Sequence, residues 1–202
     1  QPNVQVAEKR LDANFFQHQP YLDEFNKSRG TELVSIAGVH VEPFGAYSSK
    51  VKNLSELNEG AQVVIPNDAT NGGRALLLLQ KTGLISLKPE AGITATVKDI
   101  ADNPKNLKIT ELEASQTARS LPDVGASVIN VFMALDAGLN PKSDAIYIEP
   151  VNEQSKPYYN IIVSRAKDKD NATYKKIVDA YRSDDVKKLI DKLYKGAVIP
   201  LW

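Results

Sequence analysis

The sequence contains no cysteine. Disulfide bonds, thiolate metal sites and thiol nucleophiles are therefore excluded as sources of stability or chemistry. Histidine is scarce as well, since His18 and His40 are the only two. Cysteine-free proteins occur in both reducing and oxidising compartments, so this absence leaves the compartment open.

Long apolar runs and an excess of charge are also missing. The longest apolar run, residues 75–79, is far shorter than the ~20 residues of a membrane span. Acidic and basic residues balance at 25 each, so no basic surplus indicates nucleic acid or an anionic lipid surface. No signal peptide is visible, and the chain opens on Gln1 without an initiating methionine. We interpret this start as a processed or truncated end.

The 202 residues are enough for one large domain or two small lobes, each with its own core. Strand-like and helix-like runs alternate along them. The predicted strands are residues 12–16, 32–47, 61–65, 107–112, 128–129, 145–148 and 159–163. The predicted helices are residues 4–13, 21–29, 54–60, 74–82, 96–101, 131–137, 172–182 and 186–195.

This alternation predicts α/β lobes with two mostly parallel sheets flanked by helices. Irregular stretches at residues 43–52 and 150–158 indicate two connections between two lobes. Ligands of open α/β sheets bind at the carboxyl ends of strands, so the loops that follow strands are the places to search.

The first such loop follows the strand at residues 61–65. It contains Gly72, Gly73 and Arg74, and we expect a helix to begin there. Free N–H groups at a helix N-terminus, glycines that permit close approach, and a guanidinium would together bind a carboxylate. The Gly-Lys-Ser/Thr ending of a phosphate loop is absent. A capped surface helix with an exposed arginine would show the same pattern.

Two further strand ends carry candidate ligand contacts. Phe16, His18 and Tyr21 gather aromatic rings and an imidazole, which suit a thioether but also suit an ordinary core. Asn130 offers one acceptor and two donors to a zwitterion, and equally suits the N-cap of the helix that follows.

Signatures of catalysis are scarce. The sequence has no Gly-x-Ser-x-Gly elbow, no Gly-x-Gly-x-x-Gly fingerprint and no His-Glu-x-x-His helix. Its carboxylates form no diagnostic pair, and the lysine pairs at residues 175–176 and 187–188 are typical of solvated helix faces. We therefore predict neither an enzyme nor a bound metal or cofactor.

Several ordered motifs resemble one known family. Residues 12–22 resemble its "DANxFQHxPYL" signature, residues 39–48 its "HVEPxGxYS", and residues 66–76 its "PNDxTNxGRAL". Residues 103–107 and 128–130 also fit. The resemblance covers essentially the whole chain, and the family is that of the NlpA-type lipoproteins, the substrate-binding proteins of methionine ABC importers.

The resemblance implies a two-lobed, type II periplasmic-binding-protein fold that captures L-methionine between its lobes and delivers it to a membrane permease. Lobe I would comprise residues 1–48 and 157–202, lobe II residues 49–156, with hinges near 43–52 and 150–158. Family members begin with a strand–helix–strand unit ahead of the position of Gln1, so lobe I is expected to lack it. A lipid anchor upstream would hold the protein in the periplasm or at the outer face of the cytoplasmic membrane.

The resemblance also assigns roles to residues of this chain. Phe16, His18 and Tyr21 resemble those that line the side-chain pocket. Asn71 and Arg74 resemble those that hold the carboxylate, and Asn130 one that holds the amino-acid head. The helix after Asn130 begins Val-Phe-Met-Ala, where relatives often carry small polar residues and then tyrosine.

Three hypotheses remain, and that departure bears on the choice between the first two. The first is a binding protein for L-methionine. The second is a binder of another small amino acid or a methionine-containing dipeptide, and the third is an enzyme built on a two-lobed α/β fold. Mass spectrometry of ligand released from the purified protein separates the first two.

Overall fold

A computed structural model describes residues 2–202 of the chain. It divides into two compact units, which we describe separately. Unit 1 is Gln1–Glu42 with Val151–Trp202, and unit 2 is Pro43–Pro150. The chain therefore passes from one unit to the other at two prolines, about six residues before the boundaries expected from the sequence.

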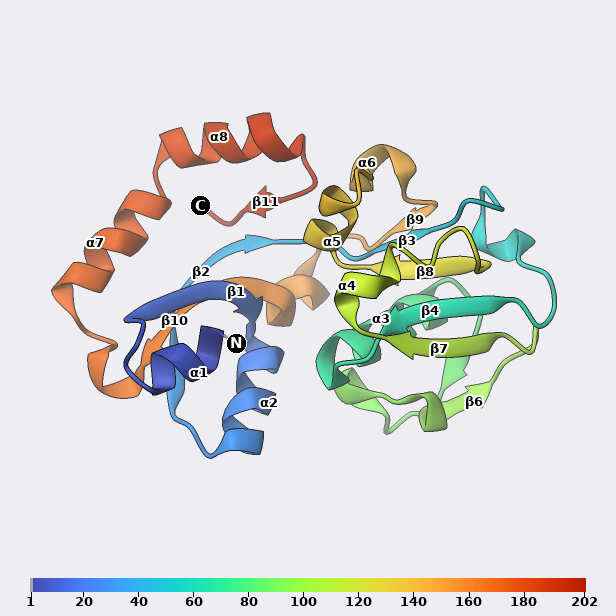
Figure 1. The fold of residues 1–202 in the computed structure, drawn as a ribbon, viewed down its shortest axis with the longest axis horizontal. Coiled ribbons are helices and arrows are strands. Elements are labelled where there is room, and N and C mark those ends of the chain that lie inside the picture. Colours follow the sequence, from blue (N-terminus) through green and yellow to red (C-terminus); the bar gives the residue numbers. More distant parts are fainter. Residues whose placement is uncertain (1) are drawn as a thin grey trace. The chain divides into compact units, whose positions relative to one another are not determined.

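Unit 1 contains a four-stranded sheet in the order β1-β10-β2-β11. Its strands are β1 (Ala13–His18), β10 (Tyr159–Arg165), β2 (Leu33–Val41) and β11 (Ile199–Pro200). β10 runs between β1 and β2 and is antiparallel to both (Figure 1). Every pairing in this sheet is antiparallel, so the expectation of a mostly parallel sheet is wrong for unit 1.

Helices cover this sheet through two separate apolar clusters. α1 (Pro2–Ala7) and α2 (Gln19–Arg29) pack through Val6 and Leu22 against β2 and β10. α7 (Ala172–Tyr181) packs through Val178 in the second cluster, and α8 (Asp184–Tyr194) follows it. α2 ends as predicted, because Gly30 adopts the left-handed conformation at φ 62° and its N–H bonds the Asn26 carbonyl. Short 3₁₀ turns occur at Glu153–Tyr158 and Ala166–Asp168.

Unit 2 contains a five-stranded mixed sheet in the order β7-β4-β8-β3-β9. β4 (Gln62–Pro66) is parallel to β7 (Lys108–Leu112) and to β8 (Ala126–Ile129), which lie on either side of it (Figure 1). β3 (Gly45–Tyr47) and β9 (Tyr147–Ile148) pair antiparallel at the other edge. The parallel prediction therefore holds only for the centre of this sheet. β5 (Ser86–Leu87) and β6 (Ile100–Asp102) form a separate small ribbon.

The helices of unit 2 follow the strands. α3 (Ala69–Lys81) buries an apolar face that includes Ala75, Leu76, Leu78 and Leu79 in the main core. The other helical segments are short: α4 (Ala114–Thr117), α5 (Val131–Asp136), α6 (Pro141–Asp144), and 3₁₀ turns at Leu54–Glu56, Gly92–Thr94 and Val97–Asp99.

Four helix predictions differ from the structure. The helix expected at residues 54–60 is only the 3₁₀ turn at Leu54–Glu56. The helix expected at residues 74–82 begins five residues earlier, because the Asp68 side chain accepts from the Asn71 N–H and caps it. The helix expected at residues 4–13 ends at Ala7, since Lys9 turns the chain at φ 63° toward β1. The stretch 96–101 is a 3₁₀ turn followed by β6.

Two further features are absent from residues 2–202. No helix there combines the length and the apolar character needed to cross a membrane. Within the same residues, no cluster of three or more histidine, aspartate or glutamate side chains is suited to a metal ion.

Candidate functional site

In unit 2, two predicted site residues meet at the carboxyl ends of neighbouring parallel strands. Asn71 lies in the first turn of α3, after β4, and Asn130 follows β8 directly. The Asn130 Nδ2 atom donates to the Asn71 Oδ1 atom at 3.3 Å. The Asn71 amide is itself oriented by Asp68, whose two carboxylate oxygens accept from Asn71 Nδ2 at 3.1 and 3.0 Å. The topology thus brings together side chains 59 positions apart.

The Asn130 side chain does not cap α5. Asn130 occupies the N-cap position, but its side chain makes no capping hydrogen bond. Its Oδ1 atom is buried and has no hydrogen-bond partner within the described part of the chain. Since a buried acceptor without a donor is costly, this oxygen is suited to meet a donor that arrives with a ligand.

Arg74 lies in the second turn of α3, not at the start of a helix as expected. Only 4% of its surface is exposed. Its Nη2 and Nε atoms lie 2.5 and 3.1 Å from the Glu149 Oε2 atom, and its guanidinium lies 4.7 Å from the centre of the Phe44 ring. The alternative of an exposed surface arginine is therefore wrong.

The two glycines before Arg74 serve packing inside the helix. A Cβ atom at Gly73 would collide with the Ile93 carbonyl oxygen and lie 3.0 Å from the Ala95 nitrogen. A Cβ atom at Gly72 would lie 2.9 Å from the Pro66 carbonyl oxygen. The helix therefore approaches neighbouring backbone closely at both positions, so the expectation that these glycines form an open loop is wrong.

In unit 1, the aromatic candidates surround the end of β1. Phe16 is an extra residue in the pairing with β10, because Phe15 pairs with Ile162 and Gln17 with Ile161. Such a bulge redirects a side chain, and Phe16 is 42% exposed. The ring centres of Phe16 and Tyr21 are 5.8 Å apart and nearly perpendicular, at 81°.

His18 links these rings to α2. It is 7% exposed, and its Nδ1 atom accepts from the Tyr21 N–H at 3.3 Å, which makes it the N-cap of the helix. Its ring centre lies 6.4 Å from that of Tyr21 and 5.5 Å from that of Tyr158, each in edge-on geometry. The structure thus brings Phe16, His18 and Tyr21 together.

A buried amide network fixes β1 behind the aromatic residues. Asn3 and Gln17 exchange hydrogen bonds of 2.7 and 2.6 Å, and Asn14 bonds to both of them. Each of these amides finds its partners across α1 and β1. The strand that carries Phe16 and His18 is therefore held from its inner side.

Sequence reasoning missed four neighbours of these two groups: Glu149, Phe44, Tyr158 and Asn160. Phe44 directly follows Pro43, and Glu149 directly precedes Pro150, so the two residues lie at opposite ends of the unit 2 sequence. The pairing of β3 with β9 brings them together beside Arg74. Asn160 is 7% exposed and pairs with His18 on one side and His40 on the other. Its position inside the predicted strand 159–163 was the only available signal.

His40 occupies a separate arrangement in unit 1. Its Nε2 atom lies 2.7 Å from Glu42 Oε1, and its Nδ1 atom lies 3.2 Å from the Tyr181 hydroxyl. The Phe15 ring contacts both His40 and Tyr181. Burial raises the pKa of Tyr181 to about 12, with smaller contributions from Tyr194 and Glu42.

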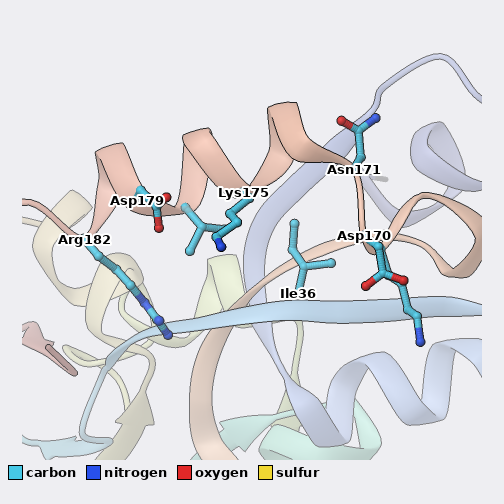
Figure 2. A pocket seen from close by; sticks show the side chains of 8 residues that line it. Ile36, Asp170, Asn171, Lys175, Asp179 and Arg182 are labelled. Atoms are coloured by element: carbon cyan, nitrogen blue, oxygen red, sulfur yellow. The ribbon is translucent and has the colours of Figure 1, made fainter.

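A pocket of about 380 Å³ lies elsewhere in unit 1. Figure 2 shows Lys175, Asp179 and Arg182 extending from α7 and its end toward β2, which contributes Ile36. Its walls alternate basic and acidic side chains and contain no aromatic ring. None of the six predicted site residues lines it, and it does not match the aromatic chemistry found at β1.

Comparison with known proteins gives these groups a family context. The model of the family "NlpA lipoprotein" matches residues 1–202. The D-methionine-binding lipoprotein MetQ of Escherichia coli K12 is 47% identical over 203 residues, covering 100% of this chain and 74% of its own length. The Salmonella typhimurium protein of the same name is 48% identical with the same coverage.

Solved structures agree. A nutrient binding protein from Burkholderia cenocepacia, determined bound to methionine, superposes with a TM-score of 0.97 at 50% identity, covering 100% of this chain and 84% of that one. The methionine-binding protein MetQ superposes with a TM-score of 0.94 at 47% identity, covering 100% and 82%. The predicted α/β class is thereby confirmed, with an antiparallel and a mixed sheet in place of two mostly parallel ones, and the chain belongs to the NlpA lipoprotein family.

Proposed function

We propose that this protein captures methionine outside the cell and delivers it to the permease of an ABC importer. Within unit 2, Asn71, Arg74 and Asn130 are our candidates for contacts with an amino-acid head. Within unit 1, Phe16, His18 and Tyr21 are our candidates for contacts with a ligand side chain. The observation on this chain that carries the proposal is the buried Asn130 Oδ1 atom without a partner, beside Asn71 and on the unit that buries Arg74.

The polar groups of unit 2 match a zwitterion. A guanidinium carries five N–H donors in a fork, so bonds to Glu149 and to a ligand carboxylate are compatible. The Asn130 Oδ1 atom can accept from the ligand ammonium, which would relieve the cost of its burial. Asn71 holds the Asn130 amide in the orientation that this requires.

The aromatic groups of unit 1 match a thioether. Sulfur gains about 0.3–1.5 kcal/mol from each well-placed aromatic contact. Phe16 and Tyr21 meet edge to face, as do His18 and Tyr21, so the group offers both ring faces and ring edges. The relatives named for methionine binding and the Burkholderia structure with methionine support this ligand.

The remaining features of the proposal follow from the family. A lipoprotein of an importer would be anchored at the outer face of the cytoplasmic membrane or face the periplasm, and would act by binding without catalysis. L-methionine is the enantiomer that we propose first. The name of the enteric relatives makes D-methionine the second candidate.

The test is calorimetric titration with L-methionine, D-methionine, the other amino acids and methionine-containing dipeptides, together with mass spectrometry of co-purified ligand. Methionine at about 100 times its dissociation constant should stabilise the folded protein by roughly 2.7 kcal/mol. A thermal shift with another amino acid or a dipeptide, and none with methionine, would overturn the ligand assignment.

Asn130→Ala is the matching variant. Loss of a hydrogen bond to a charged group costs about 1.5–3 kcal/mol, so methionine affinity should fall by about 10- to 100-fold. Asn53→Ala is the control, because Asn53 is an exposed asparagine that caps a 3₁₀ turn in the same unit. Equal affinities in the two variants would remove Asn130 from the site.

A further inference from the structure

The Glu149 carboxylate holds three hydrogen bonds on one oxygen. Its Oε2 atom accepts from Arg74 Nη2 at 2.5 Å, from Arg74 Nε at 3.1 Å and from the Phe44 N–H at 3.3 Å. The Glu149 N–H in turn donates to the Phe44 carbonyl oxygen at 2.8 Å. Both the backbone and the side chain of Glu149 are therefore fixed where they meet Arg74.

This contact is a buried ion pair. Arg74 is 4% exposed and Glu149 is 7% exposed. A buried charge without a partner is strongly destabilising, so the positive charge of Arg74 can be kept in this position only if a negative charge accompanies it. The nearby Asp68 does not supply that charge, because its oxygens accept from Thr70 and Asn71 and cap α3.

We propose that Glu149 is a positioning residue of the ligand site, which fixes the Arg74 guanidinium and makes the site select head groups of zero net charge. The inference rests on the proposed function, in which Arg74 contacts the ligand carboxylate. The charges of Arg74 and Glu149 cancel. A ligand with only a carboxylate therefore adds an unmatched negative charge to the site, and a ligand with only an ammonium adds an unmatched positive charge. A zwitterion adds no net charge.

The test compares three ligands with the same thioether side chain. Methionine has no net charge, desamino-methionine retains only the carboxylate, and decarboxy-methionine retains only the ammonium. Dissociation constants are measured by displacement of bound methionine from the wild type, from Glu149→Gln and from Glu113→Gln. Glutamine preserves the shape and an acceptor oxygen but removes the charge, and Glu113 is an exposed glutamate of the same unit.

In Glu149→Gln, the preference for desamino-methionine over decarboxy-methionine should rise by about tenfold or more, because each 1.4 kcal/mol of charge interaction is tenfold in affinity. In Glu113→Gln it should stay within about twofold. A purely structural role would weaken all three ligands alike, and that result would overturn the inference. Absence of methionine binding by the wild type would instead overturn the proposed function.

Glu149→Asp decides the matter if Glu149→Gln does not fold. Aspartate keeps the charge but withdraws the carboxylate by one methylene, which displaces the Arg74 guanidinium. Methionine and desamino-methionine should lose about tenfold in affinity, while decarboxy-methionine, which has no carboxylate for Arg74, should change by less than about threefold. A uniform loss, or no loss, would overturn the positioning role.

Discussion

The two groups of predicted ligand contacts are built in opposite ways. In unit 1, Phe16 lies on a β-bulge with 42% of its surface exposed. In unit 2, Arg74 is 4% exposed and paired with a carboxylate that is itself buried. Exposure of an apolar ring in the ligand-free protein costs little free energy. A buried charge without a partner costs much more, so it must already be paired in the ligand-free protein. Changes in unit 2 should therefore affect folding and binding together, and changes in unit 1 should separate them.

The largest effect is expected from Arg74→Ala, which leaves the Glu149 carboxylate buried without its cation. Removal of one partner of a buried pair costs about 3–5 kcal/mol, so the thermal midpoint should fall sharply as methionine affinity is lost. Arg119→Ala, at an exposed position of the same unit, should have little effect. The double variant Arg74→Ala/Glu149→Ala should be more stable than Arg74→Ala alone. If it is less stable, the pair does not account for the loss.

Gly73→Ala should destabilise unit 2 by about 1–3 kcal/mol, because the added methyl group meets the backbone of residues 93–95. The sign of the change in unfolding free energy distinguishes the two cases, because Gly→Ala inside an unconstrained helix stabilises the helix by roughly 0.5–1 kcal/mol. Gly38→Ala in β2 of unit 1 is the control, as its methyl group would make an ordinary contact of 3.7 Å with Leu201. Chemical denaturation of both variants measures the difference, and a stabilised Gly73→Ala would show that the helix can move away.

Phe16→Ala should weaken methionine binding by about three- to tenfold with little change in stability, because the ring is exposed and its gain comes from sulfur contact. Phe25→Ala provides the reverse case. Phe25 packs against the cluster of Val6 and Leu22, so its truncation should lower stability and leave affinity unchanged. Calorimetry and thermal melts on both variants would show this separation. Equal behaviour of the two variants would contradict it.

The smallest effect concerns Tyr181, whose pKa is raised from the ordinary value near 10 to about 12 by burial. Burial favours the protonated phenol in the folded state, so Tyr181 stabilises the folded protein as long as it keeps its proton. This stabilisation is complete below pH 10 and is lost as pH rises through about 12. Tyr181→Phe should cost about 1 kcal/mol at neutral pH, through loss of the bond to His40. The gap between wild type and variant should narrow between pH 10 and 12 in denaturation curves. A constant gap would show that Tyr181 does not titrate in that range.

Local signals predicted much of the fold. The end of α2 at Gly30, the strand at residues 61–65 and the helix after Asn130 are all present, because capping geometry and apolar patterning act over a few residues. Asn71 and Asn130 also lie where the sequence directed the search, after the carboxyl ends of strands β4 and β8.

Other features depended on residues far apart in the chain. The direction of pairing in unit 1 was decided by β10, which returns from the other end of the sequence and inserts between β1 and β2. The start of α3 was misplaced because Gly72 and Gly73 suggested a loop, whereas the neighbouring backbone requires them inside a helix. No local sequence pattern indicates that β10 inserts between β1 and β2, or that neighbouring backbone lies close to Gly72 and Gly73.

The sequence by itself determined the alternation of elements, the family motifs and the identity of the six candidate contacts. The tertiary structure decided how two of those contacts are held. Arg74 is fixed by Glu149 and Phe44, which are 75 and 30 positions away, and Phe16 is redirected by a bulge against β10. The reason is physical: a buried charge or an irregular strand is stabilised by whichever partner the fold brings near, and that partner leaves no mark on the residues adjacent in sequence.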